Sequence, residues 1–81
     1  MAAMRAKLHL ESVTHHSHGH ETLKFHAVCK SGSYPADGSD EDNTYAKFSP
    51  SASMEITVAN PALIGKFTPG QKFYVDFTEA K

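Results

Sequence analysis

Four of the six histidines of this chain fall within six consecutive residues, where they could serve as metal ligands. They are His15, His16, His18 and His20. Neutral imidazole is a common ligand for zinc, nickel and copper, so this stretch is a candidate metal site. A structural zinc site, however, usually takes its ligands from separate, rigid elements, whereas these four share one Gly-containing stretch. The alternative interpretation is a polar hairpin connection, and we expect no cofactor.

An acidic run is the second group of side chains that could bind something. Its carboxylates are Asp37, Asp40, Glu41 and Asp42. The alternating Asp spacing and distant bidentate Glu of an EF-hand loop are missing, which argues against calcium. Acidic loops can also dock on a basic partner surface or mimic nucleic-acid phosphate, so we predict these residues as a partner-binding site. The alternative is a solvated loop without a partner.

The residues favour a protein without catalytic activity. Cys29 is the only thiol, and its alternation with Phe25 and Ala27 predicts that it faces the core, where a thiol is usually inert. His9 and His26 could act as bases, but no serine with a neighbouring acid supports a triad. No Gly-rich phosphate-binding motif occurs in the sequence. We therefore expect a protein that is not an enzyme.

Aromatic residues beside cations suggest a nucleic-acid surface as the alternative function. The residues concerned are Tyr45, Lys47, Lys72 and Tyr74. Barrel folds stack single-stranded bases on outward tyrosines of this kind. Against this, the net charge is −1, and Asp76 shares the predicted face of Tyr74. Outward tyrosines on strands more often reflect β-propensity and cross-strand packing.

The elements that must position these groups belong to one small domain, residues 1–81. With one cysteine the chain has no internal disulfide and no cysteine-based zinc site. It contains no run of about 18 apolar residues and no recognisable signal segment, so we expect a soluble protein that binds no membrane.

Apolar residues alternate before and after the His-rich stretch, which is the period of strands with one buried face. We predict an antiparallel hairpin with a long connection. Parity and charge favour one register. Its pairs are Ala6 with Cys29, Leu8 with Ala27, His9 with His26, Leu10 with Phe25 and Glu11 with Lys24.

The rest of the chain predicts a long loop, further strands and one short helix. The loop has no aliphatic side chain larger than alanine, so we expect it to be exposed, mobile and without apolar anchors. Ile56, Val75 and Phe77 should face the core. The predicted elements are the acidic surface loop 31–43, strands at 45–48, 54–58 and 72–78, a helix that begins at Asn60-Pro61, and a turn at 68–71.

Strands this short in so small a chain can bury only one face each, so the sheet must curl or pack against the helix. We predict a mainly β fold, namely a small OB-like or SH3-like barrel. It should have four to five antiparallel strands and one short helix before the last strand.

The C-terminal third carries a more specific pattern. Residues 54–61 read MEITVANP, and residues 67–78 read FTPGQKFYVDFT, in which a Pro-Gly turn precedes a Tyr-Val-x-Phe strand. With the opening strand Met4-Arg5-Ala6-Lys7, this pattern resembles a set of small uncharacterised proteins encoded by tailed bacteriophages. The resemblance implies a phage origin and a compact, mainly β fold, and it assigns no catalytic residue. The His-rich and acidic stretches lie outside it.

The expected function is that of a non-enzymatic bacteriophage protein that acts through protein-protein contacts, as a virion or assembly component or as a binder of a host factor. Its partner would be a phage structural protein or a host protein, and its location the host cytoplasm or the virion. The alternative is an OB-like protein that binds single-stranded nucleic acid.

Overall fold

A long first strand organises the fold by pairing with a different neighbour over each of its halves. This strand is β1 (Met4–His15), in a computed structural model that describes residues 3–81. The others are β2 (Glu21–Ala27), β3 (Ser53–Val58) and β4 (Lys72–Phe77). Residues 4–9 of β1 pair with β4, and residues 8–15 pair with β2, both antiparallel.

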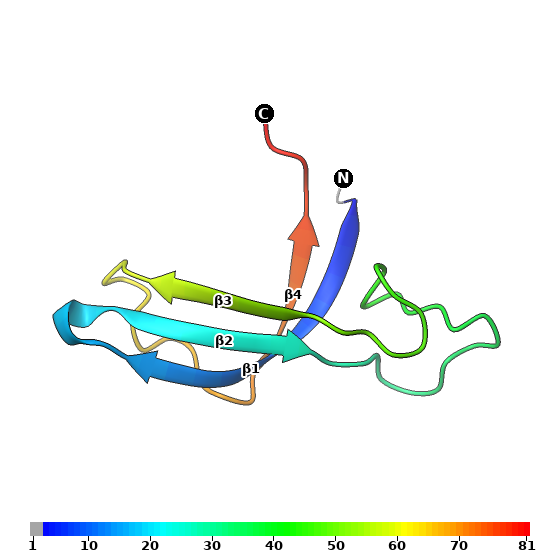
Figure 1. Cartoon of the computed structure of the whole chain (residues 1–81), viewed down its shortest axis with the longest axis horizontal. Helices are drawn as coiled ribbons and strands as arrows, with labels where there is room; N and C mark the ends of the chain where they lie inside the picture. Colours follow the sequence, from blue (N-terminus) through cyan, green and yellow to red (C-terminus); the bar gives the residue numbers. More distant parts are fainter. Residues whose placement is uncertain (1–2) are drawn as a thin grey trace.

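The four strands form one antiparallel sheet in the order β3-β2-β1-β4. A register shift between Leu10 and Ser12 marks a bulge at Glu11, where β1 bends. As Figure 1 shows, the first half of β1 and β4 therefore cross the direction of β2 and β3, and the sheet curls into a half-barrel. This confirms the predicted mainly β fold of four antiparallel strands.

The register predicted for the first hairpin is confirmed at three of its five pairs. The predicted pair of Ala6 with Cys29 is absent, because β2 ends at Ala27. Leu8 pairs with Ala27, His9 with His26 and Leu10 with Phe25. The bulge moves Ser12, in place of Glu11, opposite Lys24. The freed carboxylate of Glu11 instead lies 3.3 Å from Nδ1 of His26.

The hairpin connection is a tight turn, which corrects the long connection that we predicted. β1 continues to His15, and a single 3-10 turn, η1 (Ser17–Gly19), leads into β2. His18 and Gly19 both adopt positive φ, at 72° and 75°, which reverses the chain within a few residues.

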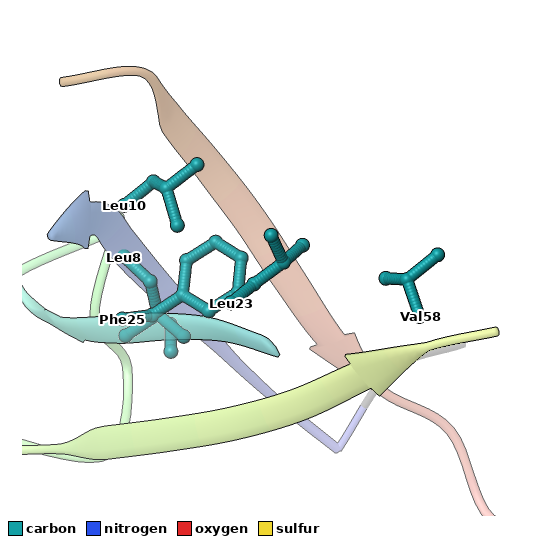
Figure 2. Close-up of a cluster of buried hydrophobic side chains, with 6 residues drawn as sticks. Leu8, Leu10, Leu23, Phe25 and Val58 are labelled. Atoms are coloured by element: carbon teal, nitrogen blue, oxygen red, sulfur yellow. The ribbon is translucent and has the colours of Figure 1, made fainter. Parts of the chain in front are cut away.

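Apolar side chains on the concave face of the sheet form the core (Figure 2). The buried residues are Ala6, Leu8 and Leu10 of β1, Leu23 and Phe25 of β2, and Val58 of β3. Each buried Leu or Phe of this kind stabilises the fold by about 1.5–3 kcal/mol. The ring of Phe73 meets Phe25 edge-on, with centroids 6.0 Å apart, and ties β4 to this core.

The half-barrel does not close, so two residues predicted to be buried are exposed. Ile56 is 48% exposed and Phe77 is 46% exposed, while Val75 is half-buried. Phe25 is buried as predicted. Alternation identified the face on which these side chains lie, but nothing covers the outer part of that face in residues 3–81.

The predicted burial of Cys29 and the predicted strand at residues 45–48 are both wrong. β2 ends at Ala27, so the alternation stops before Cys29, and this thiol is exposed and not in the core. Residues 45–48 form turns and bends, not the predicted strand. The backbone there bonds locally, with Ala46 N–H donating to the carbonyl of Asn43.

The predicted helix before the last strand is replaced by hydrogen-bonded turns over residues 61–65. Oδ1 of Asn60 accepts a hydrogen bond from Ala62 N–H at 3.0 Å, as a helix cap would. Gly65 then takes a positive φ of 80°, which ends the turn before a helix can form. The predicted turn at residues 68–71 is present, with Gln71 N–H donating to Thr68 O.

The loop between β2 and β3 is anchored to β1 by polar contacts, which the sequence did not predict. Asn43 is fully buried, and its side-chain amide lies between β1 and the chain that follows β2. Oδ1 of Asn43 accepts from Lys7 N–H at 2.8 Å, and its Nδ2 donates to the carbonyl of Val28 at 2.8 Å. Val28 N–H donates directly to the Lys7 carbonyl at 3.1 Å, and the amide bridges the second bond of this pair, from Lys7 N–H to the Val28 carbonyl.

Thr44 satisfies the next backbone groups of β1 beyond the end of β2. Its N–H donates to the carbonyl of Arg5 at 2.9 Å, and its Oγ1 accepts from Arg5 N–H at 2.8 Å. Residues 43–44 therefore serve as the neighbour of β1 where β2 has ended.

The far end of the same loop is held by aromatic packing. The rings of Tyr34 and Phe48 lie 5.8 Å apart, and a Cβ on Gly38 would collide with the ring of Phe48. Gly38 also has a φ of 74°, which favours glycine. Phe48 N–H closes this contact by donating to the carbonyl of Gly38 at 2.9 Å.

The difference in burial between two phenylalanines predicts a difference in stability. Phe25→Ala should lower the free energy of unfolding by about 3–5 kcal/mol, because it leaves a cavity in the core. Phe77→Ala should lower it by about 1 kcal/mol or less, because that ring is half-exposed. Urea unfolding of both variants checks this, and equal losses would contradict the open half-barrel.

Candidate functional site

An apolar groove of about 310 Å³ opens on the concave side of the half-barrel. Strands from three parts of the sheet and the loop before β3 contribute its walls. The main apolar residues that line it are Met4, Ala6, Val75, Phe77, Met54 and Ala52. Because Met4 and Phe77 are also more than a third exposed, the groove continues onto the surface.

Tyr45 is one of the residues that line this groove. Its hydroxyl is buried and has no hydrogen-bond partner within residues 3–81. Burial, and then the charge of Asp40, raise the pKa of the Tyr45 phenol above its ordinary value, so the hydroxyl stays neutral. A buried hydroxyl without a partner costs about 1–3 kcal/mol.

Asp40, one of the predicted partner-binding residues, is buried and holds the loop together. Its Oδ1 accepts from the backbone N–H groups of Asp42 and Asn43, and its Oδ2 accepts from Nδ2 of Asn43 at 3.2 Å. Burial acts to raise the pKa of Asp40, but these hydrogen bonds hold it below its ordinary value. Asp40 therefore positions the Asn43 amide.

The other acidic residues of the predicted site also have partners within the chain. Glu41 accepts a hydrogen bond from Nζ of Lys30 at 2.9 Å, and this bond lowers its pKa. The pKa of Asp37 is lowered by a hydrogen bond from the backbone N–H of Ser39. The structure thus places these carboxylates in local contacts within the loop.

Asp42 joins the loop to a polar cluster on the convex face. Its carboxylate accepts from Tyr74 Oη at 3.1 Å and lies 3.4 Å from Nζ of Lys7. The guanidinium of Arg5 lies over the Tyr74 ring, 4.5 Å from its centroid, and binds both oxygens of Asp76 at 2.7 and 3.1 Å. The hydrogen bond from Arg5 lowers the pKa of Asp76.

The residues of the nucleic-acid alternative do not form one surface. Tyr45 lines the concave groove, whereas Tyr74 is 53% exposed on the convex face beside Arg5. Lys47 is exposed in the loop, and Lys72 is exposed on β4 two residues before Tyr74. The structure therefore brings only Lys72 and Tyr74 to a common face.

Two of the four clustered histidines, His15 and His16, lie close to different side chains. His16 Nε2 hydrogen-bonds to Oγ1 of Thr22 at 2.7 Å. Nδ1 of His15 lies 3.2 Å from Oε2 of the buried Glu21 without forming a hydrogen bond. The side chains of all four are exposed: His15, His16, His18 and His20. In the described residues, no three His, Cys, Asp or Glu side chains lie close enough together to hold a metal ion.

His9 and His26 lie on the convex face. The sequence predicted that they pair across the strands, but it did not predict the hydrogen bond between their rings. The rings of His9 and His26 stack with centroids 4.9 Å apart, and Nδ1 of His9 lies 3.0 Å from Nε2 of His26. Such a bond requires one of the two nitrogens to be unprotonated. The Glu11 bulge places a carboxylate beside this pair, and sequence alternation gave no signal of the bulge.

No protein-family model, curated protein or solved structure gives a significant match to this chain. No helix within residues 3–81 has the length and apolar character needed to cross a membrane. The candidate site therefore rests on geometry, and the apolar groove is the feature that best fits the usual character of a ligand site.

The anchoring role of Asp40 predicts a dependence of stability on pH. A carboxyl whose pKa is lower in the folded state binds its proton more readily in the unfolded chain. Its contribution is therefore complete above about pH 5 and is lost as the pH falls below about 3.9. Asp40→Asn should lower the unfolding free energy by about 1–3 kcal/mol at pH 7, because donors around Oδ2 lose their acceptor.

Urea midpoints of wild type and Asp40→Asn between pH 7 and pH 3 measure this effect. We expect the gap between the two proteins to narrow as the pH falls, since wild-type Asp40 becomes protonated. Glu79→Gln, which removes an exposed carboxylate outside the loop, is the control. A gap that stays constant over this range would show that Asp40 does not act as a charged anchor.

Proposed function

We propose that this is a non-enzymatic protein that acts through protein-protein contacts made by its apolar groove. The observation that carries the proposal is the uncovered concave face, where Met4, Ile56 and Phe77 remain exposed. Soluble proteins that keep contiguous apolar surface usually bind a partner there. A polypeptide with apolar side chains suits this groove, because most of the residues that line it are apolar.

The resemblance to proteins of tailed bacteriophages supplies the proposed setting. In that setting the partner is a phage structural protein, met in the virion or during assembly, or a host factor in the cytoplasm. The groove suits an extended segment with an apolar side chain, because one end of it opens between exposed residues of β1 and β4.

Binding of single-stranded nucleic acid on the convex face is the weaker candidate. Tyr74 and Lys72 share that face, as such a surface requires. The carboxylates of Asp42 and Asp76, however, contact Tyr74 and Arg5, the groups that would stack on bases or bind phosphate. Negative charge at this position opposes a polyanion.

Site-specific photocrosslinking tests the proposed function. A benzoylphenylalanine at Met54, in the groove, is compared with one at Glu55, its neighbour on β3 that faces the other side. In the cells that naturally make this protein, Met54 should give one defined crosslinked protein, displaced by excess wild type. Identical products from both positions, or none from Met54, would contradict a role for the groove.

A further inference from the structure

The outer edge of β4 carries unpaired backbone groups. β4 is an edge strand whose only neighbour in residues 3–81 is β1, as Figure 1 shows. The carbonyls of Gln71 and Phe77 accept from β1, so odd-numbered residues of β4 face that strand. The N–H and C=O groups of Lys72, Tyr74 and Asp76 therefore point to the free edge, where another strand can pair.

The charged side chains of β4, Lys72 and Asp76, would face each other if two copies of this strand paired in antiparallel orientation. In an antiparallel pairing of β4 with itself, centred on Tyr74, each Lys72 lies opposite Asp76 of the second copy. This occurs twice, once on each side of the two-fold axis. Opposite charges that face each other across strands stabilise the pairing.

The apolar residues of β4 fit the same register. Phe73 lies opposite Val75 of the second copy, and both side chains belong to the concave face. The two-fold axis of this pairing is perpendicular to the sheet, so the concave faces of both copies lie on the same side. The two concave faces therefore become continuous. Sliding the pairing by two residues would place Lys72 opposite Thr78 and would lose the charge pairs.

The other free edge does not have this property. Ala27 N–H donates to the carbonyl of Ala52, so the odd-numbered residues of β3 point outward. The corresponding self-pairing of β3 is centred on Glu55 and would set two Glu55 carboxylates opposite each other. Like charges in this position destabilise a strand pair.

We propose that two copies of this chain form a symmetric dimer through the free edges of β4, centred on Tyr74 and specified by Lys72 and Asp76. Asp76 keeps its bond to Arg5 in this arrangement, because a carboxylate has further acceptor positions. The dimer uses the sheet edge and leaves the Met54 side of the groove open, so it goes beyond the protein contacts proposed above.

Analytical ultracentrifugation tests the dimer and its charge pairs. Wild type should pass from monomer to dimer as its concentration rises, and Lys72→Glu should raise the dissociation constant about tenfold or more. Lys47→Glu makes the same charge change on an exposed loop lysine and should have no effect. A wild type that stays monomeric to about 1 mM, or equal effects of the two variants, overturns the proposal.

Disulfide trapping tests the register without changing these charges. In a Cys29→Ser background, Tyr74→Cys places two thiols opposite each other across the axis, at about 5.5 Å between Cα atoms, which suits a disulfide. Val75→Cys is the control, since residue 75 faces residue 73 of the second copy. Oxidation should crosslink Tyr74→Cys rapidly and Val75→Cys slowly, and the reverse result would overturn the register.

Discussion

The side-chain amide of Asn43 is the contact on which the rest of this structure depends. β1 extends beyond the end of β2, so the backbone groups of Arg5 and the N–H of Lys7 have no strand partner on that side, while the Lys7 carbonyl still accepts from Val28 N–H at 3.1 Å. Asn43 bonds both to Lys7 N–H and to the carbonyl of Val28, and Thr44 bonds to both backbone groups of Arg5. Because each unsatisfied buried group costs about 1–3 kcal/mol, this half of β1 requires the loop in order to present its other edge to β4.

The open shape of the molecule follows from this arrangement. The chain uses residues 28–52 to complete β1 and builds no additional strand there, so β3 and β4 remain edges and the half-barrel stays open. The exposed apolar groove and the self-complementary edge of β4 are both consequences of that opening. The acidic residues have a structural part in it, since Asp40 holds Asn43 and Asp42 reaches the convex face of β4 through Tyr74.

Alternation in the sequence was sufficient to predict the strands and the hairpin register, because side chains on a strand have a period of two. It could not show whether a predicted face would be covered, and so Ile56 and Phe77 were wrongly placed in the core. Tyr45 was predicted to lie on an outward strand, and only the turns of the loop bring it into the groove. Asn43 resembled an ordinary loop residue, since its partners lie far away in the chain.

Hydrogen exchange of the Lys7 backbone amide, followed by NMR, tests most directly whether the loop completes β1. This amide has no strand partner on its side and bonds instead to Oδ1 of Asn43. If the loop is an integral part of the sheet, the Lys7 amide should be as strongly protected as that of Leu10, which bonds to the carbonyl of Gln71. Rapid exchange at Lys7 beside a protected Leu10 would show that the loop detaches from β1 and would contradict this account.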